Sequence, residues 1–228
     1  MRPDWNEYFM AIAKIVSTRS TCNSRPVGAV IVRDKQILAT GYNGAVSHAP
    51  HCIEGPGDNE NPFCFRRSIN APEEDKYNYC RANHAEANAI AQAARLGVPL
   101  EGSTLYITMT PCYVCLKMLS TARVLDIYYE YDYESTKKDR DKFWKTMVRE
   151  CGIKTFEELR ISDRTITSVV HAMKYPTSVR RLSEPPSKNE NMMTLTSAID
   201  SSEIDSTAID SSAIGSSELG SSELDSSK

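Results

Sequence analysis

The residues with the clearest chemistry in this 228-residue sequence are a histidine, two cysteines and a glutamate. His84, Cys112 and Cys115 offer three zinc ligands, and a catalytic zinc ion takes three protein ligands and keeps a fourth position for water, whose pKa falls to about 7. Glu86 lies two residues past His84 and is not needed as a ligand, so it can take up and return protons. A structural zinc site is the alternative, but the motif offers no obvious fourth ligand. The spacing therefore predicts a catalytic zinc centre with Glu86 as its acid and base.

Both groups of ligands are predicted to lie at the starts of helices. Residues 84–96 are rich in alanine and end before Gly97, a typical C-terminal cap, while residues 112–121 follow the start signal Pro111. At a helix start, the dipole favours the deprotonated form of both thiols. Strands are predicted on either side of the second helix, at residues 104–108 and 124–130. This order predicts a parallel strand pair with a crossover helix.

The remaining patterns also mix helices and strands. Residues 3–18 predict a helix, because Asp4 and Glu7 form a capping box and apolar residues recur at helical spacing. Two strands joined by a tight turn follow, at residues 27–32 and 36–40. A further helix is predicted at residues 139–151 before Gly152, and residues 165–173 are compatible with a strand or a helix. The pattern is typical of an α/β protein.

Residues 43–83 contain several prolines and no predicted helix or strand. An irregular loop of about forty residues is improbable in a compact domain unless something holds it in place. This insertion contains several potential metal ligands, namely His48, His51, Cys52, Cys64 and Cys80.

Composition predicts a cytoplasmic protein. The sequence has no apolar run of about 18 residues and does not start with a secretory signal, so no membrane partner is expected. Seven cysteines in that compartment favour metal binding or catalysis over disulfides. Residues 198–228 hold seven acidic side chains and one lysine, so the net charge of −3 leaves about +3 for the rest. That charge is too small for a nucleic-acid-binding surface.

Five-residue repeats begin at Ala198, for example Ala-Ile-Asp-Ser-Ser and Glu-Leu-Asp-Ser-Ser. One apolar residue in five buries little surface, and a pentapeptide β-solenoid would need stacking neighbours, so disorder is expected. The sequence predicts one zinc-dependent domain at residues 1–182 and a disordered low-complexity tail at residues 183–228.

A set of motifs between about residue 4 and residue 155 carries a family resemblance. The motifs are Arg19-Ser20-Thr21-Cys22, Val27-Gly28-Ala29-Val30-Ile31-Val32, Ala39-Thr40-Gly41-Tyr42-Asn43-Gly44, His84-Ala85-Glu86-Ala87-Asn88-Ala89-Ile90 and Thr110-Pro111-Cys112. They resemble the zinc-dependent deoxycytidylate (dCMP) deaminase family, and His-x-Glu with Pro-Cys-x-x-Cys is the signature of zinc nucleobase deaminases. The resemblance implies a deaminase domain at residues 1–182, with a three-layer α/β/α fold and a mixed five-stranded central sheet. It also implies hydrolysis of dCMP to dUMP and ammonia by a zinc-activated water.

The resemblance also implies roles for residues outside the zinc motif. Asn43 is expected to bind the deoxyribose hydroxyl group, and Ser24 or Arg25 the 5′-phosphate. Contacts to the base are expected from Ala85, Thr110, Pro111 and Tyr133. An ordinary solvated arginine is the alternative for Arg25, and a packing role is the alternative for Tyr133.

Regulation is a further implication. Members of this family are hexamers that dCTP activates and dTTP inhibits, with Mg²⁺ accompanying the nucleotide effector. Their effector site uses a loop that matches Tyr42, Asn43 and Gly44, although Val46 stands here where proline often follows.

A second, structural zinc ion is implied at Cys22, Cys52 and Cys80. The fourth ligand is left open between His51, Cys64 and His48, with His51 preferred. Such a site would hold the long insertion against the first helix. Small buried thiols without a metal are the alternative.

Other functions share the zinc motif. A dCTP or dual-substrate deaminase differs only in phosphate recognition, and a tRNA or polynucleotide deaminase would need a basic groove with stacking aromatic residues. A riboflavin-pathway deaminase would carry a His-Gly pattern that Tyr113 and Val114 lack. The non-enzymatic alternative is a zinc-stabilised nucleotide sensor, against which the intact Glu86 argues.

Overall fold

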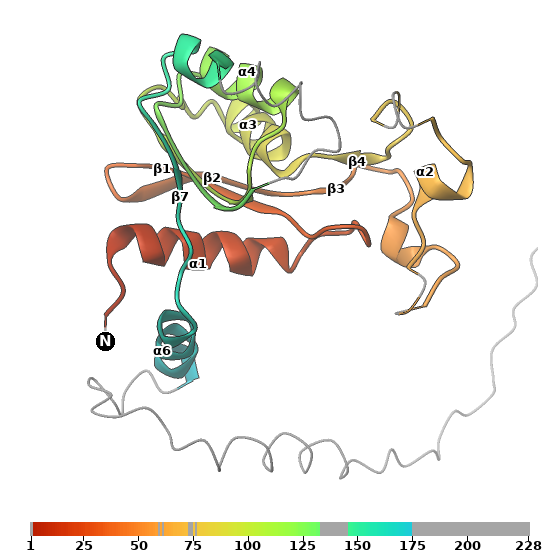
Figure 1. Ribbon diagram of the computed structural model, residues 1–228, viewed down its shortest axis with the longest axis horizontal. Coiled ribbons are helices and arrows are strands. Elements are labelled where there is room, and N and C mark those ends of the chain that lie inside the picture. Colours follow the sequence, from red (N-terminus) through yellow and green to blue (C-terminus); the bar gives the residue numbers. More distant parts are fainter. Residues whose placement is uncertain are drawn as a thin grey trace, which may run out of the picture. The chain divides into compact units, whose positions relative to one another are not determined.

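The computed structural model describes residues 2–132 and 146–174, except for residues 59, 61, 73, 74 and 76 (Figure 1). The chain divides into the units Met1–Leu182 and Ser183–Lys228. The second unit lies outside the described residues, so the disordered tail stays a prediction. All elements below belong to the first unit.

A mixed five-stranded sheet forms the centre of this unit, as the sequence predicted. Its strand order is β2-β1-β5-β6-β7. The strands are β1 (Gly28–Arg33), β2 (Gln36–Tyr42), β5 (Thr104–Met109), β6 (Asp126–Tyr131) and β7 (Thr155–Glu158). β1 is antiparallel to β2 and β5, whereas β5, β6 and β7 run parallel. Met109 pairs with Tyr131, so Thr110 follows at the carboxyl end of the parallel pair.

Helices cover both faces of the sheet and complete the predicted three layers. Figure 1 shows α1 (Trp5–Ser17) on one face, and α3 (Ala85–Leu96) and α4 (Tyr113–Thr121) on the other. Asp4 and Glu7 form the predicted capping box at the start of α1, and Gly97 ends α3 with a left-handed φ of 68°. α4 connects β5 to β6, which confirms the predicted crossover helix.

Each face of the sheet has its own hydrophobic core. The alanines of α3 (Ala85, Ala89 and Ala93) pack against buried residues that include Ile31, Ile107 and Ile127. On the opposite face, α1 contributes Phe9, Met10 and Ala13, which pack with Val30 and Tyr106. The small side chains of α3 allow its backbone to lie close to the sheet.

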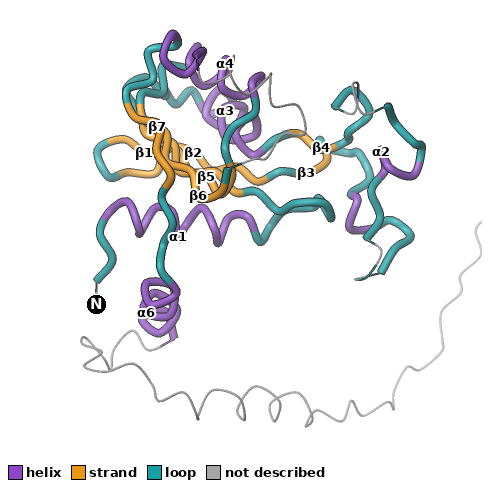
Figure 2. Tube along the Cα trace, viewed as in Figure 1, coloured by secondary structure: helices purple, strands orange, loops and turns teal. Residues whose placement is uncertain are grey.

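The insertion at residues 43–83 contains short regular elements, so the prediction that it has none was wrong. β3 (Gly44–Ala45) pairs antiparallel with β4 (Ala82–Asn83) and brings the two ends of the insertion together. Between them lie the 3-10 helix η1 (Cys52–Glu54) and the one-turn helix α2 (Phe65–Ser68), which Figure 2 shows at one end of the sheet. Elements of two to four residues are too short to produce a periodic pattern.

The C-terminal part of the unit clarifies two predictions. The segment compatible with a strand or a helix is the helix α6 (Asp163–Lys174), and β7 was not predicted. Of the helix predicted at residues 139–151, residues 146–150 are helical and residues 139–145 lie outside the described part. None of the helices in the described part is long and apolar enough to cross a membrane.

Candidate active site and metal centre

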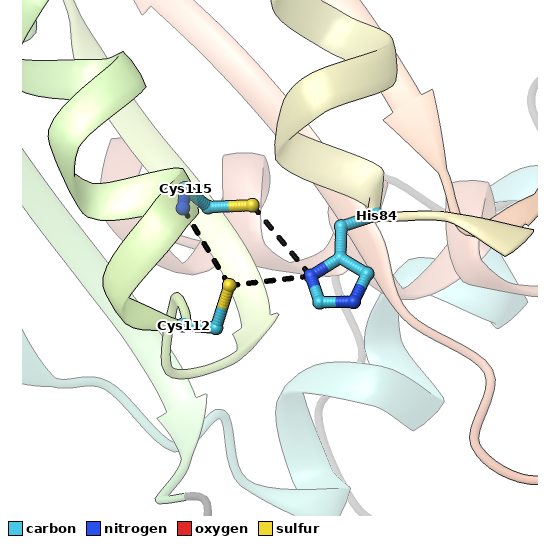
Figure 3. A group of neighbouring side chains, drawn as sticks. All are labelled: His84, Cys112 and Cys115. Carbon is cyan, nitrogen blue, oxygen red and sulfur yellow. Dashed lines mark hydrogen bonds between the residues drawn. The ribbon is translucent and has the colours of Figure 1, made fainter. Parts of the chain in front are cut away.

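Three potential metal ligands converge between the starts of two helices. His84 is the N-cap residue of α3, Cys112 is the N-cap residue of α4, and Cys115 lies in the first turn of α4. In Figure 3, the Nδ1 atom of His84 lies 3.4 Å from the Sγ atom of Cys112 and 3.6 Å from that of Cys115. Tetrahedral zinc, with Zn–N bonds of about 2.0–2.1 Å and Zn–S bonds of about 2.3 Å, separates nitrogen from sulfur by about 3.5 Å. The cluster therefore has the geometry that a zinc ion needs.

The surroundings of Cys112 favour its thiolate form. Its Sγ atom accepts a hydrogen bond from the backbone N–H of Cys115 at 3.5 Å. Hydrogen bonds from the Cys115 thiol, from the His84 imidazole and from this N–H lower the pKa of Cys112 to about 4, although burial acts in the opposite direction. Because zinc binds the thiolate, this low pKa favours metal binding near neutral pH.

Glu86 lies in the first turn of α3 and is only 4% exposed. Burial raises the pKa of Glu86 to about 7, while a hydrogen bond from its own backbone N–H and the neighbouring charge of His84 oppose the rise. A zinc ion would oppose it further through its positive charge. A carboxyl group that titrates near neutral pH can both accept and donate a proton during one reaction.

A cavity of about 240 Å³ opens beside this cluster and reaches His84, Glu86 and Cys112. Of the residues predicted to bind substrate, it is also lined by Ser24, Arg25, Asn43, Ala85 and Thr110. Pro111 connects two lining residues without lining the cavity itself, and Tyr133 lies outside the described residues. The structure thus brings five of the seven predicted substrate residues to one cavity.

The two remaining residues of the predicted effector loop, Tyr42 and Gly44, do not line this cavity. The Tyr42 side chain is exposed, and its backbone carbonyl accepts a hydrogen bond from the Asn88 side chain at 2.8 Å. Gly44 lies in β3, where an added Cβ atom would come within 2.5 Å of the Thr21 hydroxyl oxygen.

Asn43 organises the loop between α1 and β1. Its Oδ1 atom accepts hydrogen bonds from the Ser20 hydroxyl group at 2.7 Å and from the Val27 backbone N–H at 2.8 Å. Its Nδ2 atom donates to the backbone carbonyl of Arg25 at 2.8 Å. Since an amide nitrogen carries two hydrogens and one bond of this nitrogen is found among the described residues, the second N–H of Asn43 can serve a ligand. It can therefore donate to a sugar hydroxyl group while it holds Arg25.

The insertion supplies cavity residues that were missed in the sequence, namely Arg66, Arg67, Tyr77 and Arg81. The Tyr77 ring meets the His84 ring edge to face, with centroids 5.6 Å apart. The Arg66 guanidinium interacts electrostatically with the nearby thiols of Cys64 and Cys80 and with His84. The paired arginines 66 and 67 were the available sequence signal, but no local pattern placed them near the zinc ligands.

The cysteines proposed for a second metal also line this cavity. They are Cys22, Cys52, Cys64 and Cys80. Burial raises the pKa of Cys80, and the nearby Cys22 and Cys64 thiols contribute to the rise. The Nδ1 atom of His51 is buried and has no hydrogen-bond partner among the residues that the structure describes. Within the described ranges, however, His84, Cys112 and Cys115 form the one group whose ligand atoms all lie within 4.8 Å of one another.

Comparison with known proteins gives a consistent result. The family model of the cytidine and deoxycytidylate deaminase zinc-binding region matches residues 3–131. The deoxycytidylate deaminase of Mycobacterium phage D29 is 39% identical over 133 residues, which cover 56% of this chain and 95% of the phage protein. ComE operon protein 2 of Bacillus subtilis is 37% identical over 134 residues, which cover 59% of this chain. The match spans 63% of that bacterial protein, less than two thirds of its length.

A solved structure shares the fold. The crystal structure of dCMP deaminase from the cyanophage S-TIM5 in complex with dCMP and dUMP has a TM-score of 0.52 and 28% identity. It covers 69% of this chain and 98% of the phage chain. Because the family model matches more than half of the sequence, the chain belongs to the cytidine and deoxycytidylate deaminase zinc-binding family, as its motifs predicted.

Proposed function

We propose that the protein hydrolyses dCMP to dUMP and ammonia, with zinc held by His84, Cys112 and Cys115. The observation that carries this proposal is the buried carboxyl group of Glu86 beside the ligand cluster, at a cavity also lined by several arginines. Guanidinium groups suit a phosphate, so a cavity lined by both the candidate zinc ligands and arginines suits a phosphorylated base. The dCMP and dUMP bound to the similar cyanophage enzyme support this substrate.

The reaction requires two proton transfers that Glu86 can perform. Bound at the cluster, zinc supplies a Lewis acid that lowers the pKa of water to about 7. Glu86 takes a proton from the attacking water and donates it to the ring nitrogen beside the amine-bearing carbon. It then moves the remaining proton of that water to the leaving amine, which departs as ammonia. Glu86 ends the cycle in its starting protonation state.

The other predicted residues orient the nucleotide in this proposal. The free N–H of Asn43 donates to the deoxyribose hydroxyl group, and Ser24 and Arg25 bind the 5′-phosphate. The backbone of Thr110 is fixed, because its N–H donates a hydrogen bond to the Tyr131 carbonyl at 2.9 Å. Thr110 can therefore offer the base a contact at a fixed position. The residues proposed to contact the base are Ala85, Thr110, Pro111 and Tyr133.

The test is ammonia release from cytidine, CMP, dCMP and dCTP, measured in parallel with the zinc-loaded protein. The proposal expects the highest kcat/KM with dCMP. Equal rates on all four compounds, or no release from dCMP, would contradict it. A preference for dCTP would favour the alternative substrate instead.

Allosteric control of the same reaction is a separate proposal. We infer that dCTP activates and dTTP inhibits a hexamer through Tyr42, Asn43 and Gly44, and the exposed Tyr42 side chain supports a binding role for this loop. Mg²⁺ would come with the triphosphate, since the one group of potential metal ligands found among the residues that the structure describes contains no carboxylate. Activity titrated with each nucleotide, together with light scattering, tests this proposal. A flat response to both nucleotides would reject it.

A second zinc ion is proposed at Cys22, Cys52, Cys80 and His51. The thiols that line one cavity and the unpartnered Nδ1 atom of His51 support it, and the ligand atoms would have to draw closer around a metal. Two zinc ions per chain are expected by elemental analysis, and Cys52→Ala should remove one of them. One zinc ion per chain in both proteins would exclude this site.

A further inference from the structure

The cavity contains a cation that the predicted substrate residues do not include. We propose that Arg67, supplied by the insertion, determines specificity by binding the phosphate of the nucleotide together with Arg25. This inference rests on the proposed function and adds the residue that would separate phosphorylated from unphosphorylated substrates.

Contacts lead from the metal centre to Arg67 through the loop between α1 and β1. Asn43, which lines the cavity with Glu86, holds the Arg25 backbone carbonyl at 2.8 Å. The preceding residue, Ser24, accepts a hydrogen bond from the Nη2 atom of Arg67 at 2.8 Å. Arg67, Ser24 and Arg25 all line the cavity, and the Nη1 atom of Arg25 lies 3.9 Å from the Sδ atom of Met109, another lining residue. Two arginines and a serine hydroxyl group that line one cavity match the charge and the acceptors of a phosphate monoester.

Arg67 lies on an anchored helix, and one hydrogen bond from its guanidinium is found among the described residues. α2 is anchored where the Arg81 guanidinium stacks on the Phe65 ring, 3.6 Å from its centroid. The Arg67 side chain is exposed, and Ser24 takes one of the five N–H groups of its guanidinium. The remaining N–H groups can meet an oxyanion that enters from solvent.

Arg66, the neighbouring cation, is less suited to this role. Its guanidinium interacts electrostatically with the thiols of Cys64 and Cys80, with Tyr77 and with His84. Arg66 therefore faces the thiols and the metal centre, whereas Arg67 faces Ser24. The two arginines of α2 point to different parts of the cavity.

The test compares dCMP with deoxycytidine, which lacks the phosphate, in the zinc-loaded full-length protein. Because a hydrogen bond to a charged group contributes about 1.5–3 kcal/mol, Arg67→Gln should lower kcat/KM for dCMP by about 10- to 100-fold, mainly through KM. The value for deoxycytidine should change less than about twofold. Arg67→Lys keeps the charge but loses the fork, so it should give a smaller loss with dCMP. The matched control is Arg95→Gln at the exposed end of α3, outside the cavity, which should change neither value.

Calorimetry with the product provides a readout besides turnover. Arg67→Gln should weaken binding of dUMP and leave binding of deoxyuridine unchanged. An equal loss of kcat/KM on dCMP and deoxycytidine would show that Arg67 only supports the fold, and unchanged values on both would show that it does not meet the phosphate. Either result overturns the inference while the wild-type activity still supports the proposed function. Wild-type protein that releases no ammonia from dCMP would overturn both.

Discussion

Gly41 in β2 lets the first turn of α3, which carries Glu86, lie directly on the sheet. A Cβ atom at this position would lie 2.1 Å from the backbone oxygen of Ala85 and 2.6 Å from the backbone nitrogen of Ala89. Ordinary contacts of a Cβ atom begin at 3.4 Å, so Gly41→Ala must move β2 and α3 apart by about 1.3 Å at Ala85. Both obstructing atoms are backbone, so no side chain can rotate away.

This displacement acts on the metal centre because Ala85 lies between His84 and Glu86. A misplacement of about 1 Å can cost about 100-fold in rate, and overpacking a well-packed core costs about 1–3 kcal/mol. We therefore expect Gly41→Ala to fold with a lower Tm, to bind zinc more weakly and to lose about 100-fold in kcat for dCMP.

Gly97→Ala at the other end of α3 is the matched control. Gly97 has a φ of 68°, and a Cβ atom added there would have no other atom within 4 Å, so alanine strains the backbone without a clash. That strain costs about 1–2 kcal/mol, similar to the cost at Gly41, but leaves His84 in place. Thermal unfolding, zinc analysis and ammonia release should separate the two variants. If Gly41→Ala keeps full zinc content and full kcat, the close approach of α3 does not position the site.

Three further changes have defined outcomes. Glu86→Gln should retain zinc but reduce ammonia release by at least about 100-fold, and substantial turnover would rule out Glu86 as the proton carrier. Lys14→Met leaves the Glu130 carboxylate, only 4% exposed and 2.6 Å from Lys14, without its partner, so unfolding by urea should show a loss of about 3 kcal/mol that Glu130→Gln partly restores. Asn43→Asp removes the donor to the Arg25 carbonyl at a buried position, so kcat/KM for dCMP should fall by about tenfold and Tm should fall as well; an unchanged KM would count against the proposed role of Asn43.

Features that depend on near neighbours in the chain were predictable. The capping box of Asp4 and Glu7 and the left-handed cap at Gly97 are each set by interactions within a few residues. The positions of the candidate zinc ligands were predictable in the same way, because Cys112 and Cys115 lie on one helical turn and His84 begins a helix. The parallel pairing of β5 and β6 followed from the strand, helix and strand order.

Other features became clear only from the tertiary structure, because they depend on contacts between segments that are distant in the sequence. β7 is a four-residue edge strand with two exposed glutamates, and its pairing with β6 defines it more than its own composition does. The insertion reaches the metal centre because β3 pairs with β4 and because Arg81 stacks on Phe65, and neither contact leaves a periodic pattern. Sequence alone therefore indicated the three candidate zinc ligands, because each lies at a helix start that near neighbours in the chain define. The tertiary structure decided which cations share the cavity, since Arg67 and Ser24 are 43 residues apart and meet only through the fold.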